Sequence, residues 1–156
     1  MTEIVLPKID RSILNNKSEI VRKLAKFTNP ENVLSEADEL RPYETDALSV
    51  YTQTPLAVVL PENTQEVSEI LKYCNEQNIK VVPRGAGTGL SGGALPLQDA
   101  ILLGLGKFNK ILEIDYENKC VITQPGVTNL GITHAVTCCA NGSCRSNERR
   151  RSRCND

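Results

Sequence analysis

The 156-residue sequence contains no tryptophan, one methionine and one histidine, and only 4% of its residues are aromatic. No run of apolar residues approaches the ~20 that a membrane span needs, so we expect no transmembrane segment. The N-terminus lacks the basic start and apolar stretch of a secretory signal, which favours a cytoplasmic location. No Gly-Lys-Ser or Gly-Lys-Thr sequence is present, and this excludes a P-loop.

Paired metal-binding spacings are also missing. Four of the six cysteines crowd into residues 138 to 154 without a Cys-x-x-Cys pair, so we assign no metal site. The sole histidine, His134, falls on a short helical pattern, where a packing or surface role is commoner than catalysis. We therefore assign no catalytic residue. Cys74 and Cys120 each lie inside an apolar pattern, and we expect both to be buried free thiols.

The charge is unevenly distributed along the chain. The net charge is −1, but residues 137–156 carry five arginines against two acidic residues, so the remainder is mildly acidic. An acidic body argues against a nucleic-acid surface. The basic tail has no aromatic residue on which bases would stack, and a solvated run of charge is the simpler interpretation. We expect no nucleic-acid partner.

Apolar periodicity predicts a strand, helix and strand between residues 57 and 82. Residues 57–60 form a short apolar run that ends at a proline, as a buried strand would. Thr64 is in place to cap a helix with apolar residues at i, i+3, i+4 and i+7. Asn78 suits a left-handed C-terminal cap, and residues 79–82 form the second strand. Two such strands are expected to pair in parallel through a right-handed crossover.

The other elements are predicted by the same patterns. A short helix follows Asn16, and an irregular polar segment spans 31–54. A further strand covers 100–103, an antiparallel hairpin joins 111–115 to 119–123, and a helix begins at Thr128.

Half of the ten glycines fall within the nine residues from Gly85 to Gly93, directly after the second predicted strand. Such a loop presents bare backbone N–H groups to an anion, and the end of a strand in this kind of unit is a usual ligand position. The segment matches G-x-G-x-x-G, but a Rossmann loop opens into a helix, whereas Leu95-Pro96 and a predicted strand follow here. The residues predict a phosphate or pyrophosphate cradle, with a long flexible loop as the alternative.

Three side chains near this loop are candidates to assist. Arg84, at its entrance, is either a phosphate partner or a plain surface cation, and spacing alone does not decide between them. Thr88 and Ser91 offer hydroxyl donors.

The segment from Val82 to Ala94, together with the valine-rich strand before it and a helix opening Thr64-Gln65-Glu66-Val67, resembles the FAD-linked oxidases of the vanillyl-alcohol oxidase (PCMH-type) family. Within that family it is most similar to the FAD-binding subunits of bacterial glycolate oxidases, and then to D-lactate dehydrogenases. The stretches Tyr43 to Asp46 and Gln124 to Val127 also fit. The resemblance covers residues 30 to 136.

The resemblance implies an α+β fold, namely the first lobe of a PCMH-type FAD-binding domain, with a mixed parallel and antiparallel sheet and flanking helices. Residues 1–50 would be a helical and irregular segment, 51–136 the N-terminal part of the FAD-binding domain, and 137–156 an aberrant, disordered tail. The implied cofactor is FAD, with its pyrophosphate wrapped by backbone amides. The implied cofactor-binding residues are Pro83, Arg84, Gly85, Ala86, Gly87, Thr88, Gly89, Leu90, Ser91, Gly126 and Val127.

The resemblance further implies oxidation of a 2-hydroxy acid, of the glycolate or D-lactate type, with other oxidase subunits as possible partners. Family members are several times longer than one lobe, and the pattern departs from theirs after Val136. We therefore expect a truncated chain that is inactive alone. The alternative is a stand-alone nucleotide- or phosphate-binding or subunit-interaction module.

Overall fold

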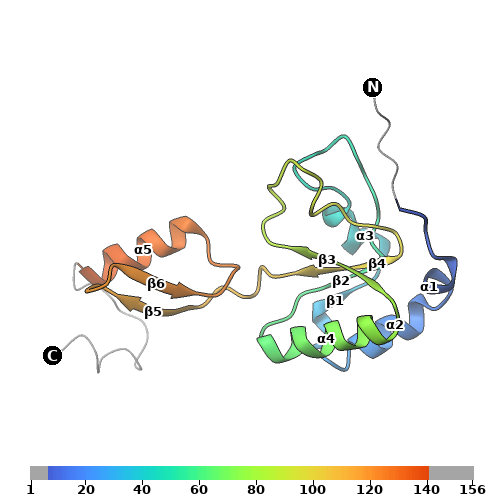
Figure 1. Cartoon of the computed structure of the whole chain (residues 1–156), viewed down its shortest axis with the longest axis horizontal. Helices are drawn as coiled ribbons and strands as arrows, with labels where there is room; N and C mark the ends of the chain where they lie inside the picture. Colours follow the sequence, from blue (N-terminus) through green and yellow to red (C-terminus); the bar gives the residue numbers. More distant parts are fainter. Residues whose placement is uncertain (1–6, 141–156) are drawn as a thin grey trace. The chain divides into compact units, whose positions relative to one another are not determined.

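The computed structural model describes residues 7–140, with the backbone alone for 138–140 (Figure 1). The chain divides into two compact units, Met1–Phe108 and Asn109–Asp156. Most of the predicted aberrant tail, residues 141–156, lies outside the described residues. In the part that is described, no helix combines the length and apolar character needed to cross a membrane.

The first unit is built on a mixed four-stranded sheet in the order β1-β2-β4-β3. β1 runs antiparallel to β2, whereas β2 and β3 each pair in parallel with β4. The mixed sheet with helices confirms the expected fold class. The strands are β1 (Val33–Leu34), β2 (Ala57–Val59), β3 (Lys80–Arg84) and β4 (Ala100–Gly104).

The predicted direct pairing of β2 with β3 is wrong, because β4 lies between them. Ile101 of β4 is opposite Ala57 on one side and Val81 on the other. All five residues of β4 are buried, as an unbroken apolar run requires when helices cover both faces of a sheet. The longest apolar strand therefore lies between β2 and β3, which run parallel to each other without pairing directly.

Alternating side chains of β2 and β4 supply cores on the two faces of the sheet. On one face, Val59 and Leu103 pack in a cluster that includes residues of α2 (Lys17–Leu24) and α4 (Thr64–Glu76). On the other face, Val58 and Leu102 pack with Leu40, the last residue of α3 (Ala37–Leu40). A further helix, α1 (Arg11–Asn15), precedes α2.

Both ends of α4 have defined caps. The N-cap is Asn63 rather than the predicted Thr64: its side chain accepts a hydrogen bond from Glu66 N at 3.0 Å. At the other end Asn78 has φ +54°, which confirms the left-handed cap. Ile79 N donates to Cys74 O at 2.8 Å and Asn78 N to Asn75 O at 3.3 Å, the two bonds of a Schellman motif.

The segment 31–54, predicted to be irregular, contains β1, α3 and two 3-10 turns, η1 (Pro30–Asn32) and η2 (Arg41–Tyr43). These elements are two to four residues long, so they show no apolar period in the sequence. Tertiary contacts hold them: Leu60 N donates to Asn32 O at 2.9 Å, and β1 pairs with β2.

The second unit is the predicted hairpin followed by a helix. β5 (Ile111–Asp115) and β6 (Cys120–Thr123) are antiparallel, which confirms the hairpin. α5 (Asn129–Ala140) continues one turn beyond Thr137, where we expected the tail to begin, and Thr137 Oγ1 donates to Thr133 O at 2.8 Å.

The two cysteines of the body differ in their surroundings. Cys74 is a buried free thiol, as predicted, and burial raises its pKa to about 11. Cys120 is also free but exposed, so that half of the prediction is wrong. Residues of β6 alternate between exposed and half-buried, so an apolar pattern along this hairpin does not guarantee burial.

Candidate cofactor site

The glycine loop, residues 85–93, begins where β3 ends, at the carboxyl edge of the sheet. β3 remains paired with β4 up to this point: Arg84 is opposite Gly104, and Leu105 N donates to Arg84 O at 2.9 Å. In Figure 1 the connection from β3 to β4 lies beside the connection that precedes β2. The paired strand β3 therefore fixes the position at which the glycine loop begins, and the connection that precedes β2 flanks the loop.

Three glycines of the loop face open space. A Cβ atom built at Gly85, Gly89 or Gly93 would meet nothing within 4 Å. Most of the loop is exposed, including Leu90, which is 72% exposed. The loop thus leaves uncovered backbone that a Cβ would obstruct, and this fits a diphosphate bound by main-chain N–H groups.

Two further glycines have backbone angles that only glycine adopts easily. Gly87 has φ +70° and Gly92 has φ +72°. A Cβ at Gly87 would lie 2.6 Å from Arg84 Nε, whereas one at Gly92 would lie 3.8 Å from Leu48 Cδ2. These two positions shape the loop, while the open glycines provide access to it.

The Arg84 side chain contacts the backbone of residues 43–45. Its Nη1 donates to Tyr43 O at 3.0 Å and its Nη2 donates to Thr45 O at 2.5 Å. Its Cζ also lies 5.9 Å from the centre of the Tyr43 ring. The sequence left open whether this guanidinium was a phosphate partner or a surface cation; in the structure it binds two backbone carbonyls 39 and 41 residues upstream.

The segment that receives Arg84 contacts the loop a second time. Ala47 N donates to Gly87 O at 2.8 Å. Between these contacts Asp46 is buried, with Oδ1 accepting from Leu48 N at 2.9 Å. Asp46 Oδ2 is buried without a hydrogen-bond partner in the described part of the chain. We call residues 43–48 the brace segment. The sequence identified its family pattern but not its contact with the loop.

The remaining predicted site residues fall in two places. Pro83 lies within β3 opposite Leu103, and Thr88 and Ser91 are exposed on the loop. Gly126 and Val127 belong to the second unit, between β6 and α5, where Val127 N donates to Gln124 O at 3.2 Å. Nine consecutive residues are thus brought together at the end of β3, and two lie in the other unit.

A polar cluster stands at the end of β2. Asn32, almost fully buried, donates from Nδ2 to Glu62 Oε1 at 3.0 Å and accepts from Lys107 Nζ. Lys107 also pairs with Glu62 at 3.6 Å. A Cβ at Gly104 would lie 2.7 Å from Leu60 Cδ2. These contacts tie the connection after β4 to the end of β2.

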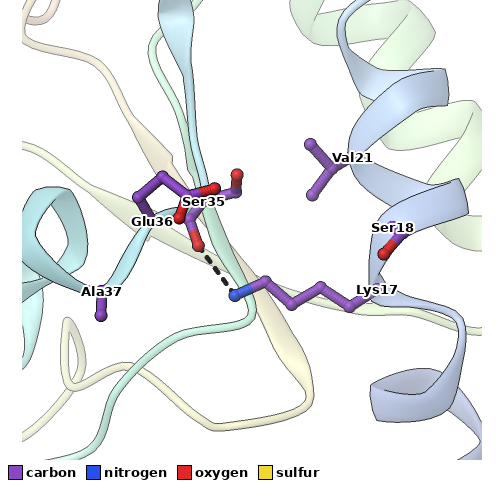
Figure 2. Close-up of a pocket in the computed structure, with 6 residues that line it drawn as sticks. All are labelled: Lys17, Ser18, Val21, Ser35, Glu36 and Ala37. Atoms are coloured by element: carbon purple, nitrogen blue, oxygen red, sulfur yellow. Dashed lines mark hydrogen bonds between the residues drawn. The ribbon is translucent and has the colours of Figure 1, made fainter.

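The hollow drawn in Figure 2 lies elsewhere, between α2 and the turn after β1. Lys17 Nζ crosses it to donate to Ser35 O at 2.8 Å. Its lining contains no residue of the glycine loop or the brace segment. Within the described residues, no group of three His, Cys, Asp or Glu side chains is placed to hold a metal ion, and His134 is exposed.

The glycine loop leaves open backbone at the carboxyl end of a parallel strand, in a mixed sheet with helices on both faces. This arrangement is typical of domains that bind nucleotides or phosphate. Residues 55–137 match the family described as an FAD binding domain, which is more than half of the chain. The chain belongs to this family, and its cofactor is FAD.

Three relatives named for their activities share sequence with 46% to 84% of this chain. It is 42% identical over 131 residues to glycolate oxidase subunit GlcD of Escherichia coli K12, covering 84% of this chain and 25% of that protein. It is 39% identical over 118 residues to the subunit of the same name in Bacillus subtilis, covering 76% and 25%. D-lactate dehydrogenase of Archaeoglobus fulgidus is 51% identical over 71 residues, covering 46% and 16%.

Solved structures share the fold. p-Cresol methylhydroxylase with substrate bound superposes with a TM-score of 0.70 at 30% identity, over 89% of this chain and 27% of that one. 4-Ethylphenol oxidase from Gulosibacter chungangensis gives 0.72 at 24% identity, over 89% and 27%, and supports the fold alone. The PCMH-type fold is thereby confirmed. The chain spans about a quarter of the length of the two GlcD subunits and of these two structures.

Proposed function

We propose that the backbone N–H groups from Arg84 to Ser91 hold the diphosphate of FAD, with Pro83 directing the chain out of β3. Gly126 and Val127, in the second unit, are proposed to approach the cofactor as well. The observation that carries this proposal is the open space where Cβ atoms at Gly85 and Gly89 would lie. Main-chain amides at such positions approach an anion without obstruction.

We further propose that the protein to which this lobe corresponds oxidises a 2-hydroxy acid of the glycolate or D-lactate type. The support comes from relatives named for these activities and from membership of an FAD-binding family. When bound, FAD supplies the acceptor for a hydride from the substrate. The residues of this chain contribute binding and orientation of the cofactor, and none is assigned a proton-transfer role. Other oxidase subunits are proposed partners.

The 156-residue chain by itself is proposed to bind FAD without turning over a substrate. The alignment with the GlcD relatives covers only about a quarter of their length, so most of what surrounds a substrate in them has no counterpart in the aligned residues. Oxidation of glycolate or D-lactate by the purified 156-residue chain would contradict this part of the proposal.

Diphosphate recognition is tested by competition. FAD is titrated into the purified chain while flavin fluorescence is followed, and ADP or riboflavin is then added in excess. ADP carries the diphosphate and is expected to displace FAD, whereas riboflavin lacks it and is expected to leave FAD bound. Displacement of FAD by riboflavin but not by ADP would mean that the chain binds the isoalloxazine ring and not the diphosphate, and it would contradict the proposed role of the loop. Equal affinity for ADP and FAD would favour a nucleotide-binding module instead.

A further inference from the structure

Arg84 is the only residue next to the glycine loop whose side chain, among the described residues, hydrogen-bonds to the brace segment 43–48. Its guanidinium donates to Tyr43 O and Thr45 O and lies over the Tyr43 ring. The ion pairs found in the described part of the chain do not include it. Its donors are therefore directed at backbone carbonyls and not at a carboxylate.

Gly87 makes this arrangement possible. The guanidinium occupies the space where a Cβ at Gly87 would lie, within 2.6 to 3.0 Å of its Nε, Nη2 and Cζ atoms. The backbone of Gly87 also contacts the brace segment, because Gly87 O accepts a hydrogen bond from Ala47 N at 2.8 Å. Arg84 and Gly87 thus hold the brace segment at three points, two through a side chain and one through the main chain.

We propose that the Arg84 side chain has a positioning role: its guanidinium holds the glycine loop against the brace segment and so sets the direction of the loop's amides, and the guanidinium itself does not ligate the diphosphate. The claim about the diphosphate rests on the proposed function. The claim that Arg84 holds the loop against the brace segment does not. A planar guanidinium donates to two carbonyls two residues apart in one fixed geometry. A lysine ammonium is a point charge on a flexible stem and cannot reproduce that geometry.

The first test needs no ligand. Amide proton exchange at Ala47 is measured by NMR in the wild-type chain, in Arg84→Lys and in Arg84→Met. Both variants are expected to speed exchange at Ala47 at least about tenfold, because the hydrogen bond to Gly87 O loses its support. Arg22→Lys is the matched control, since Arg22 is exposed and its one ion pair within residues 7–140 is with Glu19 at 4.0 Å. An unchanged exchange rate at Ala47 in both Arg84 variants would contradict the proposal that Arg84 holds the loop against the brace segment.

The second test separates positioning from phosphate ligation. FAD affinity is measured over a range of salt concentrations for the same variants. A positioning role predicts that Arg84→Lys loses as much affinity as Arg84→Met, about tenfold or more, while the salt dependence stays as in the wild type. A phosphate ligand would predict a nearly normal Arg84→Lys and a shallower salt dependence in Arg84→Met, and that result would overturn the proposal.

The two tests fail in different ways. If the wild-type chain binds no FAD, the proposed function fails, while the exchange at Ala47 still decides whether Arg84 supports the brace. A third variant adds a check on coupling: Gly87→Ala pushes the guanidinium aside, so its effect on Ala47 exchange is expected to be far from additive with that of Arg84→Met. Additive effects would contradict a shared contact.

Discussion

A Cβ atom added to Gly87 would lie 2.6 Å from Nε of Arg84, and Gly87 has φ +70°. Any side chain there meets two penalties, because left-handed backbone costs a non-glycine residue about 1–2 kcal/mol and the guanidinium must also move. Gly87→Val is therefore expected to lower the melting temperature and to abolish FAD retention by the purified chain. Thermal unfolding and flavin absorbance measure the two effects. A variant that kept full FAD binding would remove Gly87 from the site.

Gly89→Ala asks a different question, because nothing lies within 4 Å of the added Cβ and its φ is not in the left-handed region. The free energy of unfolding should therefore stay within about 0.5 kcal/mol of the wild-type value. FAD affinity should nevertheless fall about tenfold, because the methyl group enters the space proposed for the diphosphate. Gly106→Ala is the control, an equally open glycine outside the loop, and should change neither property. Normal FAD binding by Gly89→Ala would place the cofactor elsewhere.

The next prediction concerns which residue caps the N-terminus of α4. Asn63 accepts the hydrogen bond from Glu66 N, so Asn63→Ala is expected to cost about 1 kcal/mol of unfolding free energy. Thr64→Ala is the matched comparison, because Thr64 is the first helical residue and makes no cap, and it should cost much less. Urea titrations of both variants measure the difference. A larger loss for Thr64→Ala would restore the cap that the sequence predicted.

Local patterns in the sequence were enough to predict α4, the strands β2, β3 and β4 and the hairpin, because each carries an apolar period or run that its own residues define. The order of the strands was not predictable in this way. That β4 separates β2 from β3 depends on which strand is most apolar on both faces, a comparison across the whole sheet.

In the candidate site, too, features set by local sequence were predictable and features set by tertiary contacts were not. Glycine density after a strand predicted the loop, and Asn78 predicted its own left-handed cap. The partners of Arg84 were out of reach, because they are backbone carbonyls about forty residues upstream and any residue has a carbonyl. The identity of the side chains at Tyr43 and Thr45 therefore gives no sign of these two hydrogen bonds. Only the fold brings the brace segment to the loop.

Asp99 and Lys80 provide the last prediction, which concerns pH. Burial of Asp99 acts to raise the pKa of its carboxyl, but hydrogen bonds from Lys80 Nζ at 2.6 Å and Asp10 N at 2.7 Å outweigh it, and the net pKa is lowered. A lowered folded-state pKa stabilises the protein above the unfolded value of about 3.9, and this stability is lost as pH falls through the folded pKa.

Asp99→Asn should therefore cost about 1 kcal/mol of unfolding free energy at neutral pH, a modest figure because the Lys80 side chain is 40% exposed. The gap between wild type and variant should narrow as pH falls below about 4, since protonation removes the charge from the wild-type carboxyl. Urea unfolding at neutral pH and at a series of acidic values measures both curves. Asp38→Asn, at an exposed carboxylate on α3, is the control and should show no comparable gap at neutral pH. A gap for Asp99→Asn that stayed constant down to the lowest pH would mean that packing, and not the ionised pair, is what Asp99 contributes.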